Sequence, residues 1–333
     1  MTDLSIIICT HNPRFDYLKR VLDALKAQSL PKERWELLLI DNASKEPLSS
    51  AWDLSWHPYA RHILEVKLGL TPARLRGIEE SQSEIILFVD DDNVLQADYL
   101  EVLLKLVAEH SQLGCLGAGI LEPEFEQEPT AELRPYTEGL ACLALCSLPS
   151  ARWSNFVDDG YLPMGAGLAV RREVAVRYLA VVQSCPIRVQ LDRRGSVLNS
   201  GGDLEFSWIA CELGLGKGMF PSLKITHLID QRRVGKQYLL SIAQGHAFSD
   251  ALLACLHGKP ILSSTPPSTF GDILSNFFSA KLSSTIYHAR SWRRARRKSA
   301  IERDFDEACR SGVEQARNFL NETEAQRVDA GLS

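Results

Sequence analysis

The sequence predicts an α/β fold in which a mixed, mostly parallel sheet is flanked by helices. Apolar runs of strand length alternate with amphipathic helical patterns over residues 1–120, an alternation that is typical of parallel sheets with helical crossovers. Polar residues follow directly after three of these apolar runs, at Thr10, Asp41 and Asp90. Ligands bind beyond the carboxyl ends of the strands in open sheets of this kind, so these residues also predict a shared site.

Each predicted element follows from residue spacing and local turn signals. Residues 15–28 carry leucine and valine at helical spacing, after a loop marked by Asn12 and Pro13. Pro72 lies in the first turn of the next predicted helix, where its missing amide proton does no harm. The predicted strands cover residues 4–9, 35–40, 62–66 and 85–89, and the predicted helices cover residues 15–28 and 71–81.

The composition indicates a folded chain with one large domain and an extension, or with two smaller domains. Of the 333 residues, 45% are hydrophobic and 24% are charged, which argues against disorder. We expect a domain over residues 1–250, with halves at 1–120 and 121–250, and a helical extension over residues 251–333. The net charge of -5 gives no general electrostatic reason to bind nucleic acid.

The cysteines and the N-terminus indicate the compartment. The eight cysteines are dispersed without a CxxC pair, so we expect neither a disulfide framework nor a zinc knuckle. The N-terminus lacks a basic region followed by an apolar core and a cleavage site. No window reaches the roughly 18 to 20 apolar residues that a membrane span needs. We therefore expect a cytoplasmic protein with reduced cysteines.

Three consecutive carboxylates, Asp90, Asp91 and Asp92, end the apolar run at residues 85–89. They repel one another and resist dehydration, so a divalent cation or a solvated turn must compensate them. Hard oxygen ligands favour Mg²⁺ or Mn²⁺. The alternative is a turn whose aspartates cap a helix that begins near residues 96–99.

Four motifs in the first 92 residues carry a resemblance to a known family. They are SIIICTHN at residues 5–12, LLIDNAS at 38–44, GLTPARLRGI at 69–78 and FVDDD at 88–92. Their order and approximate spacing resemble glycosyltransferase family 2, whose members have the GT-A fold. Further similar segments lie at residues 164–172, 202–205 and 226–227, so the resemblance covers roughly residues 3–250.

The resemblance implies a transferase that moves a sugar, with inversion, from a nucleotide-diphosphate sugar to an acceptor hydroxyl. The default donor is a UDP-sugar, the acceptor is a saccharide or is lipid-linked, and the cofactor is Mn²⁺ or Mg²⁺. The family further suggests bacterial polysaccharide or glycoconjugate synthesis. The 1–120 half would bind the nucleotide sugar, and the 121–250 half would supply the acceptor site and the base.

The resemblance also implies roles for residues of the nucleotide-sugar site. Thr10, Asn12 and Asp41 would seat the base and ribose, although Asp41 equally suits a turn cap after a strand. Arg74 would face the nucleotide or diphosphate, because a planar guanidinium matches phosphate oxygens. Leu75 follows it where the family usually has Asn.

The aspartate triplet resembles the family's Asp-x-Asp element. Asp92 would ligate the metal that bridges the donor diphosphate, Asp90 would approach the ribose or the metal, and Asp91 would assist. His227 would be a further metal or diphosphate ligand after a predicted edge strand at residues 223–226, or else an ordinary polar residue.

The second half of the chain supplies the predicted base and acceptor site. The resemblance makes Asp203 the general base, with Gly202 in place of the usual Glu, and makes Glu205 an acceptor-binding candidate. Both acids lie at the start of a predicted helix that ends at Gly214, so the alternative is ordinary helix-dipole compensation. Gly165 and Gly167 allow the backbone to pack close to a sugar, or they only permit a tight turn.

The C-terminal part has a different character. Residues 237–256, 273–282 and 300–320 have helical patterns, and a basic cluster with Trp292 spans Arg290–Lys298. Such a cluster can dock on an anionic membrane as a peripheral contact. Alternatively, it forms a solvated helix face or pairs with the acids at residues 302–307.

Two other functions use similar features. A sugar nucleotidyltransferase also combines a parallel sheet with a metal at acidic residues, but it predicts a glycine-rich phosphate loop where residues 9–13 read CTHNP. A non-catalytic nucleotide-sugar-binding protein would keep the fold without turnover, and the presence of Asp92 and Asp203 argues against it.

Overall fold

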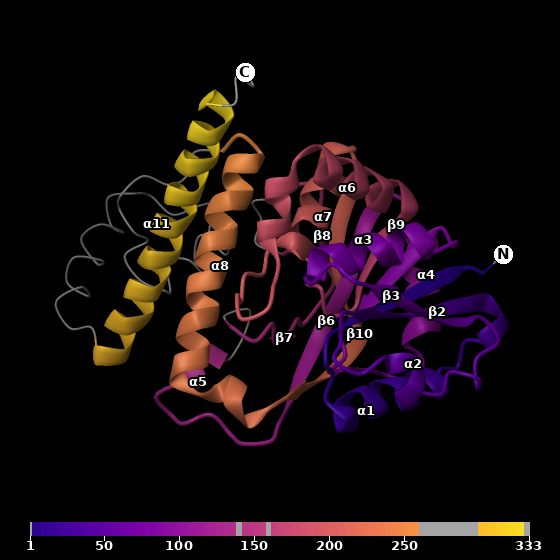
Figure 1. Cartoon of the computed structure of the whole chain (residues 1–333). Coiled ribbons are helices and arrows are strands. Elements are labelled where there is room, and N and C mark those ends of the chain that lie inside the picture. The colour runs from indigo at the N-terminus through magenta and orange to yellow at the C-terminus, as the bar shows by residue number, and fades with distance from the viewer. Residues whose placement is uncertain (1, 138–141, 158–160, 260–298, 330–333) are drawn as a thin grey trace.

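The structure is a computed structural model that describes residues 2–137, 142–157, 161–259 and 299–329. A sheet of ten described strands forms its centre, in the order β3-β2-β1-β4-β9-β6-β10-β5, with β7 beside β6 and β8 beside β10. Helices cover both faces (Figure 1). This arrangement confirms the predicted mixed α/β fold of GT-A type.

The first half of the sheet matches the sequence prediction. Strands β1 (Leu4–Thr10), β2 (Trp35–Asn42), β3 (Ala60–Glu65) and β4 (Ile85–Val89) pair in parallel. Helices α1 (Phe15–Lys26) and α3 (Leu70–Glu80) connect them where the helical spacing predicted. All four predicted strands are therefore present.

The second half of the sheet adds antiparallel pairs. Strand β9 (Leu168–Arg171) lies antiparallel between β4 and β6 (Leu113–Phe125), while β6 and β10 (Gly216–Ile229) are parallel. The prediction of an edge strand at residues 223–226 is wrong, because β10 has β6 on one side and β5 (Asn93–Leu95) on the other. The remaining strands are β7 (Cys146–Ser147) and β8 (Arg152–Ser154).

Two apolar cores fill the space between the sheet and its helices. The first contains Ile6 and Ile8 of β1 with residues of α1 and α4 (Tyr99–Glu109). The second contains Ile7 of the same strand with residues of the helices on the opposite face. Successive side chains of a strand point to opposite faces, so one strand contributes to both cores. The helices of the second core are α3, α6 (Arg172–Ser184) and α7 (Gly202–Glu212).

Two long helices form the C-terminal part and lie side by side in Figure 1. They are α8 (Lys236–Leu256) and α11 (Ala300–Asp329), which confirms two of the three helices expected there. Their contact buries Phe305 and Cys309 against Leu239 and Ala243. The third expected helix, at residues 273–282, and the basic cluster Arg290–Lys298 lie outside the described residues. Helix α8 runs through position 250, where we placed a domain boundary, and that boundary stays a prediction.

Contrary to the prediction that no window is long and apolar enough for a membrane span, helix α8 meets that requirement by length and composition alone. Half of its apolar window is buried inside the protein. The short helical segments are η1 (Lys32–Arg34), α2 (Leu48–Ala51), α5 (Arg134–Thr137), η3 (Pro186–Leu191) and η4 (Gln231–Val234).

Candidate active site

A cavity of about 400 Å³ opens at the carboxyl ends of β1, β2 and β4. The register pairs Thr10 with Asp41 in neighbouring strands, and the aspartate triplet continues from the end of β4. Eight of the predicted site residues line this cavity, although they come from distant parts of the chain. They are Thr10, Arg74, Asp90, Asp91, Asp92, Gly165, Asp203 and His227.

The aspartate triplet makes contacts within the cavity rather than with α4. The Asp91 carboxylate accepts a hydrogen bond from the Thr10 hydroxyl, and Asp92 Oδ1 accepts one from the Asn93 amide at 2.9 Å. Burial and the charge of Asp92 raise the pKa of Asp91 to about 7. The cap residue of α4 is Asp98, so the described contacts do not support the helix-cap alternative for the triplet.

Asp92 also pairs with two groups from the end of β10 and the segment after it. Its Oδ2 lies 3.4 Å from His227 Nε2 and 2.5 Å from Arg233 Nη1. Burial opposes ionisation, but His227 and Arg233 more than offset it and hold the pKa of Asp92 below its ordinary value. Asp92 is therefore an ionised carboxylate that faces the cavity.

Asp92 and His227 could hold part of a metal site. Among the described residues, no three His, Cys, Asp or Glu side chains converge as a complete set of ligands. The 3.4 Å between Asp92 Oδ2 and His227 Nε2 nevertheless suits neighbouring ligands of an ion with bonds of about 2.1 Å. Mg²⁺ often takes one or two protein ligands and completes its shell with substrate phosphates and water. The residues present therefore fit a metal that arrives with a diphosphate.

The buried Arg74 forms an ion pair that the sequence did not predict. Its Nη1 donates to Asp192 Oδ1 and Oδ2 at 3.1 and 3.0 Å, and Thr71 Oγ1 donates to the same carboxylate at 2.7 Å. Arg193, the next residue, lines the cavity. The structure thus places the Arg74 side chain at the cavity wall, where Asp192 holds it.

Asp203 lies at the start of α7 with its carboxylate fixed by the backbone. Its Oδ2 accepts from the amide of Gly165 at 2.7 Å, and its Oδ1 accepts from the amide of Leu204 at 3.0 Å. A Cβ at residue 165 would lie 2.9 Å from Arg74 Nη2 and 3.3 Å from Asp203 Oδ2. Gly165 therefore allows the close approach that orients this carboxylate.

Four of the predicted site residues do not line the cavity. Asp41 accepts from the amides of Ser44 and Leu48, both at 3.0 Å, which is the turn-capping arrangement. Asn12 accepts from the Lys45 amide at 2.9 Å, and the Gly167 carbonyl accepts from the Tyr99 hydroxyl at 3.0 Å. The fourth residue is Glu205.

Glu205 is fully buried on another side of α7. Its carboxylate forms an ion pair with Arg188 and lies 3.5 Å from His257 Nε2. Neither partner lines the cavity. The geometry gives Glu205 a structural position, and its predicted acceptor role has no contact in the cavity to support it.

Helix α8 contributes two polar cavity residues that the sequence did not predict. His246 and Asp250 line the cavity together with Asp203. Burial and the charge of Asp203 raise the pKa of Asp250 to about 7. The spacing of four residues places both polar side chains on one face of an apolar helix, and this signal could have identified them.

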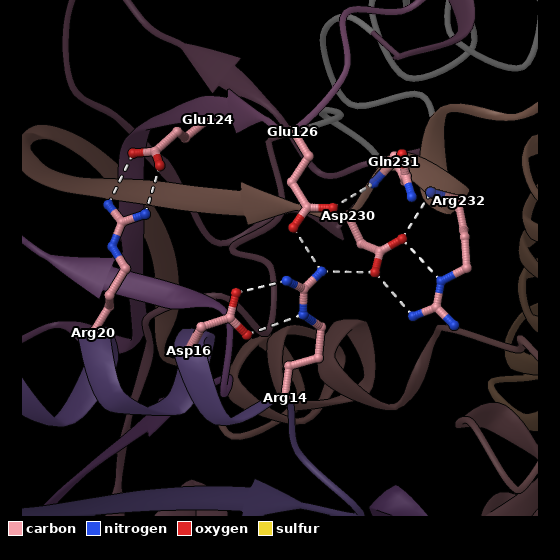
Figure 2. A network of polar contacts seen from close by, with 8 residues as sticks. All are labelled: Arg14, Asp16, Arg20, Glu124, Glu126, Asp230, Gln231 and Arg232. Carbon is pink, nitrogen blue, oxygen red and sulfur yellow. Dashed lines mark hydrogen bonds and ion pairs between the residues drawn. The ribbon is translucent and has the colours of Figure 1, made fainter.

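A polar network holds the chain segments around the cavity (Figure 2). Arg14, which precedes α1, pairs with Asp16 at 2.6 Å, Glu126 at 2.7 Å and Asp230 at 2.8 Å. Asp230 in turn caps η4 by accepting from the Arg232 amide at 2.7 Å. One guanidinium thus joins the start of α1, the end of β6 and the segment that carries Arg233.

Residues 5–137 match the family model described as "Glycosyl transferase family 2". This part of the chain is therefore similar to glycosyl transferase family 2. The matched region, residues 5–137, contains β1 to β4 and the aspartate triplet. Four other cavity residues lie outside the matched region, namely Asp203, His227, Arg233 and Asp250. They line the same cavity as the aspartate triplet.

Two glycosyltransferases are similar to part of this chain. Glycosyltransferase AglE of Haloferax volcanii is 28% identical over 101 residues, which are 29% of this chain and 33% of that protein. Polypeptide N-acetylgalactosaminyltransferase 3 of Drosophila melanogaster is 29% identical over 110 residues, which are 32% of this chain and 16% of that protein. The matched segments span a third or less of these relatives.

A solved structure shares the fold over nearly the whole chain. The mannosyltransferase PcManGT of Pyrobaculum calidifontis, in complex with GDP-Man and Mn²⁺, superimposes with a TM-score of 0.55. The match covers 95% of this chain and 89% of the mannosyltransferase at 16% sequence identity. The mannosyltransferase therefore shares the overall fold both of residues 5–137 and of the part of the chain that follows them.

Proposed function

We propose that this protein is a metal-dependent glycosyltransferase that moves a sugar from a nucleotide-diphosphate sugar to an acceptor hydroxyl with inversion. The observation that carries the proposal is the shared cavity. It joins a metal half-site, Asp92 and His227, with a backbone-oriented carboxylate, Asp203. The match of residues 5–137 to the family model supports the same function.

The first requirement is to stabilise the leaving nucleoside diphosphate. Asp92 and His227 would hold Mn²⁺ or Mg²⁺ as an Asp-x-Asp-type site, and the bound ion would neutralise charge that grows on the diphosphate. Arg193 and Arg233 line the same cavity and supply further positive charge to the phosphate oxygens. Thr10, the last residue of β1, donates a hydrogen bond that holds Asp91 in place after β4.

Asp203 would act as the general base. Its carboxylate takes the proton of the acceptor hydroxyl while that oxygen forms a bond to the anomeric carbon. The bond between the anomeric carbon and the diphosphate oxygen breaks on the opposite side, so the configuration inverts. The amides of Gly165 and Leu204 orient the carboxylate for this step.

The proposed donor and acceptor are those that the family resemblance implies, and the solved structure of similar fold supports a nucleotide-sugar donor. We propose a UDP-sugar as the default donor, with GDP-mannose as the next choice because the mannosyltransferase of similar fold holds GDP-Man and Mn²⁺. The acceptor is a saccharide or is lipid-linked, in bacterial polysaccharide or glycoconjugate synthesis. We also propose a cytoplasmic location, with peripheral membrane contact through Arg290–Lys298.

Release of nucleoside diphosphate from a panel of UDP-, GDP- and dTDP-sugars, with and without Mn²⁺, tests the proposal. We expect metal-dependent release with at least one donor. Loss of the base or of the metal ligand, by Asp203→Asn or Asp92→Ala, should lower the rate by about 100-fold or more. Asp53→Asn, at an exposed turn away from the cavity, should leave the rate unchanged. Wild-type rates in both site variants would reject these assignments.

A further inference from the structure

Arg233 occupies the place that a metal would take. Its Nη1 lies 2.5 Å from Asp92 Oδ2 and 3.2 Å from His227 Nε2. These are the two atoms that face each other across the metal half-site. A cation coordinated by both atoms cannot share them with a guanidinium nitrogen at these distances.

The polar network in Figure 2 holds the segment that carries Arg233. Asp230 caps η4 and accepts from Arg14 and from the Arg232 side chain, and Glu126 accepts from the Gln231 amide at 3.1 Å. None of these anchoring residues lines the cavity. The position of Arg233 on Asp92 is therefore supported from outside the cavity.

The guanidinium of Arg233 still has an unsatisfied donor. Its Nε is buried and has no hydrogen-bond partner among the described residues, while Nη1 is bound to Asp92. An unpaired buried N–H costs free energy, and a phosphate oxygen is a partner that a guanidinium matches well. Because Arg233 lines the cavity, the unpaired Nε–H indicates that an anionic ligand binds there.

We propose that Arg233 holds Asp92 until a metal–nucleoside diphosphate complex binds, and then transfers its guanidinium to the diphosphate. This inference rests on the metal half-site of the proposed function. A metal that enters alone must leave a buried guanidinium without its carboxylate, which is costly. A metal that enters with a diphosphate brings the replacement anion, so metal and nucleotide bind cooperatively, and the coupling is reciprocal.

Mn²⁺ titrations followed by electron paramagnetic resonance, without nucleotide and with saturating GDP or UDP, test this role without any measurement of turnover. Without nucleotide, Arg233→Ala and Arg233→Gln should each bind Mn²⁺ at least about tenfold more tightly than wild type. Arg233→Lys keeps the charge and should remain close to wild type. With nucleotide, the gain in Mn²⁺ affinity should be larger for wild type than for Arg233→Ala.

Arg232→Ala is the matched control, because Arg232 is the neighbouring arginine, pairs with Asp230 and is 78% exposed. It should bind Mn²⁺ like wild type in both conditions. Equal Mn²⁺ affinity of wild type, Arg233→Ala and Arg233→Gln without nucleotide would overturn the role of Arg233, even if GDP or UDP still promotes Mn²⁺ binding. Absence of Mn²⁺ binding by every variant in both conditions would overturn the metal half-site itself.

Discussion

The guanidinium of Arg74 lies 3.0 Å from the carboxylate of Asp192, although 118 residues separate them in the sequence. Both side chains are almost completely buried. The pair joins α3 to the loop after η3. It therefore connects two parts of the chain that must stay together for the cavity to form.

Breaking this ion pair should destabilise the fold. Arg74→Met leaves Asp192 as an uncompensated buried charge, and we expect a loss of about 3–5 kcal/mol in the free energy of unfolding. Arg74→Met combined with Asp192→Leu removes both charges and should lose less. Urea denaturation measures both variants. A double variant less stable than Arg74→Met would contradict the buried-charge explanation.

Arg14 and Arg20 offer a matched comparison of two surface ion pairs. Both arginines join the α1 region to the end of β6 (Figure 2). Arg14 does so through Glu126, and Arg20 does so through Glu124 at 2.5 Å. Of the two arginines, only Arg14 also pairs with Asp230. We expect Arg14→Ala to raise the KM for the donor, because η4 loses an anchor, while Arg20→Ala leaves it unchanged.

Stability separates this positioning role from a general loss of folding. Arg20→Ala should lose at most about 1 kcal/mol, as exposed ion pairs usually do, and Arg14→Ala should lose somewhat more because Asp230 is nearly buried. Arg14→Lys should raise the KM for the donor less than Arg14→Ala does, because lysine keeps a positive charge near Asp230. If Arg20→Ala raises the KM as much as Arg14→Ala does, the network does not act through η4.

The raised pKa of Asp250 predicts a pH-dependent effect on stability. In the folded protein, burial and the charge of Asp203 raise its pKa to about 7, whereas an unfolded Asp titrates near about 3.9. Between these values the folded chain keeps a proton that the unfolded chain has lost, so this group makes stability fall as pH rises.

Asp250→Asn removes that titration, so its Tm relative to wild type should rise between about pH 5 and about pH 8. Differential scanning fluorimetry measures the difference. For Asp53→Asn, the same difference should stay constant across this range, because its side chain has a lowered pKa. A constant difference for Asp250→Asn as well would contradict the raised pKa.

Gly165 and Gly167 should respond differently to alanine. Gly167 has φ +74°, and a Cβ there would collide with Ile225 and Tyr99, so Gly167→Ala should lower the Tm by several degrees. A Cβ at Gly165 meets the Arg74 and Asp203 side chains instead, so Gly165→Ala should lower kcat with a smaller change in Tm. Equal effects of both variants on kcat and Tm would contradict this distinction.

The sequence predicted the parts of the site that depend on local pattern. Strands β1, β2 and β4 are apolar runs with polar residues at their ends, and parallel pairing alone brings Thr10 and the aspartate triplet to one edge. Asp203 was predicted as the base from the family resemblance, whereas its place at the start of a helix by itself indicated only helix-dipole compensation. These features need no knowledge of distant contacts.

The remaining features depend on contacts between distant segments. The pairing of Arg74 with Asp192, and of Arg233 with Asp92, joins residues 118 and 141 positions apart. Glu205 looked like a cavity residue because it lies two positions after Asp203, but the helical twist turns it towards Arg188 and His257. Spacing along one helix cannot show which of its faces meets the cavity.

The proposed function depends most on a metal site between Asp92 and His227 that forms with a nucleoside diphosphate. Anomalous diffraction at the manganese edge, from crystals grown with Mn²⁺ and GDP or UDP, tests it directly. We predict a manganese peak within bonding distance of Asp92 and His227, beside the diphosphate, with the Arg233 guanidinium moved from Asp92 to a phosphate oxygen. A nucleotide bound in the cavity without manganese at Asp92 and His227 would contradict the proposed metal site.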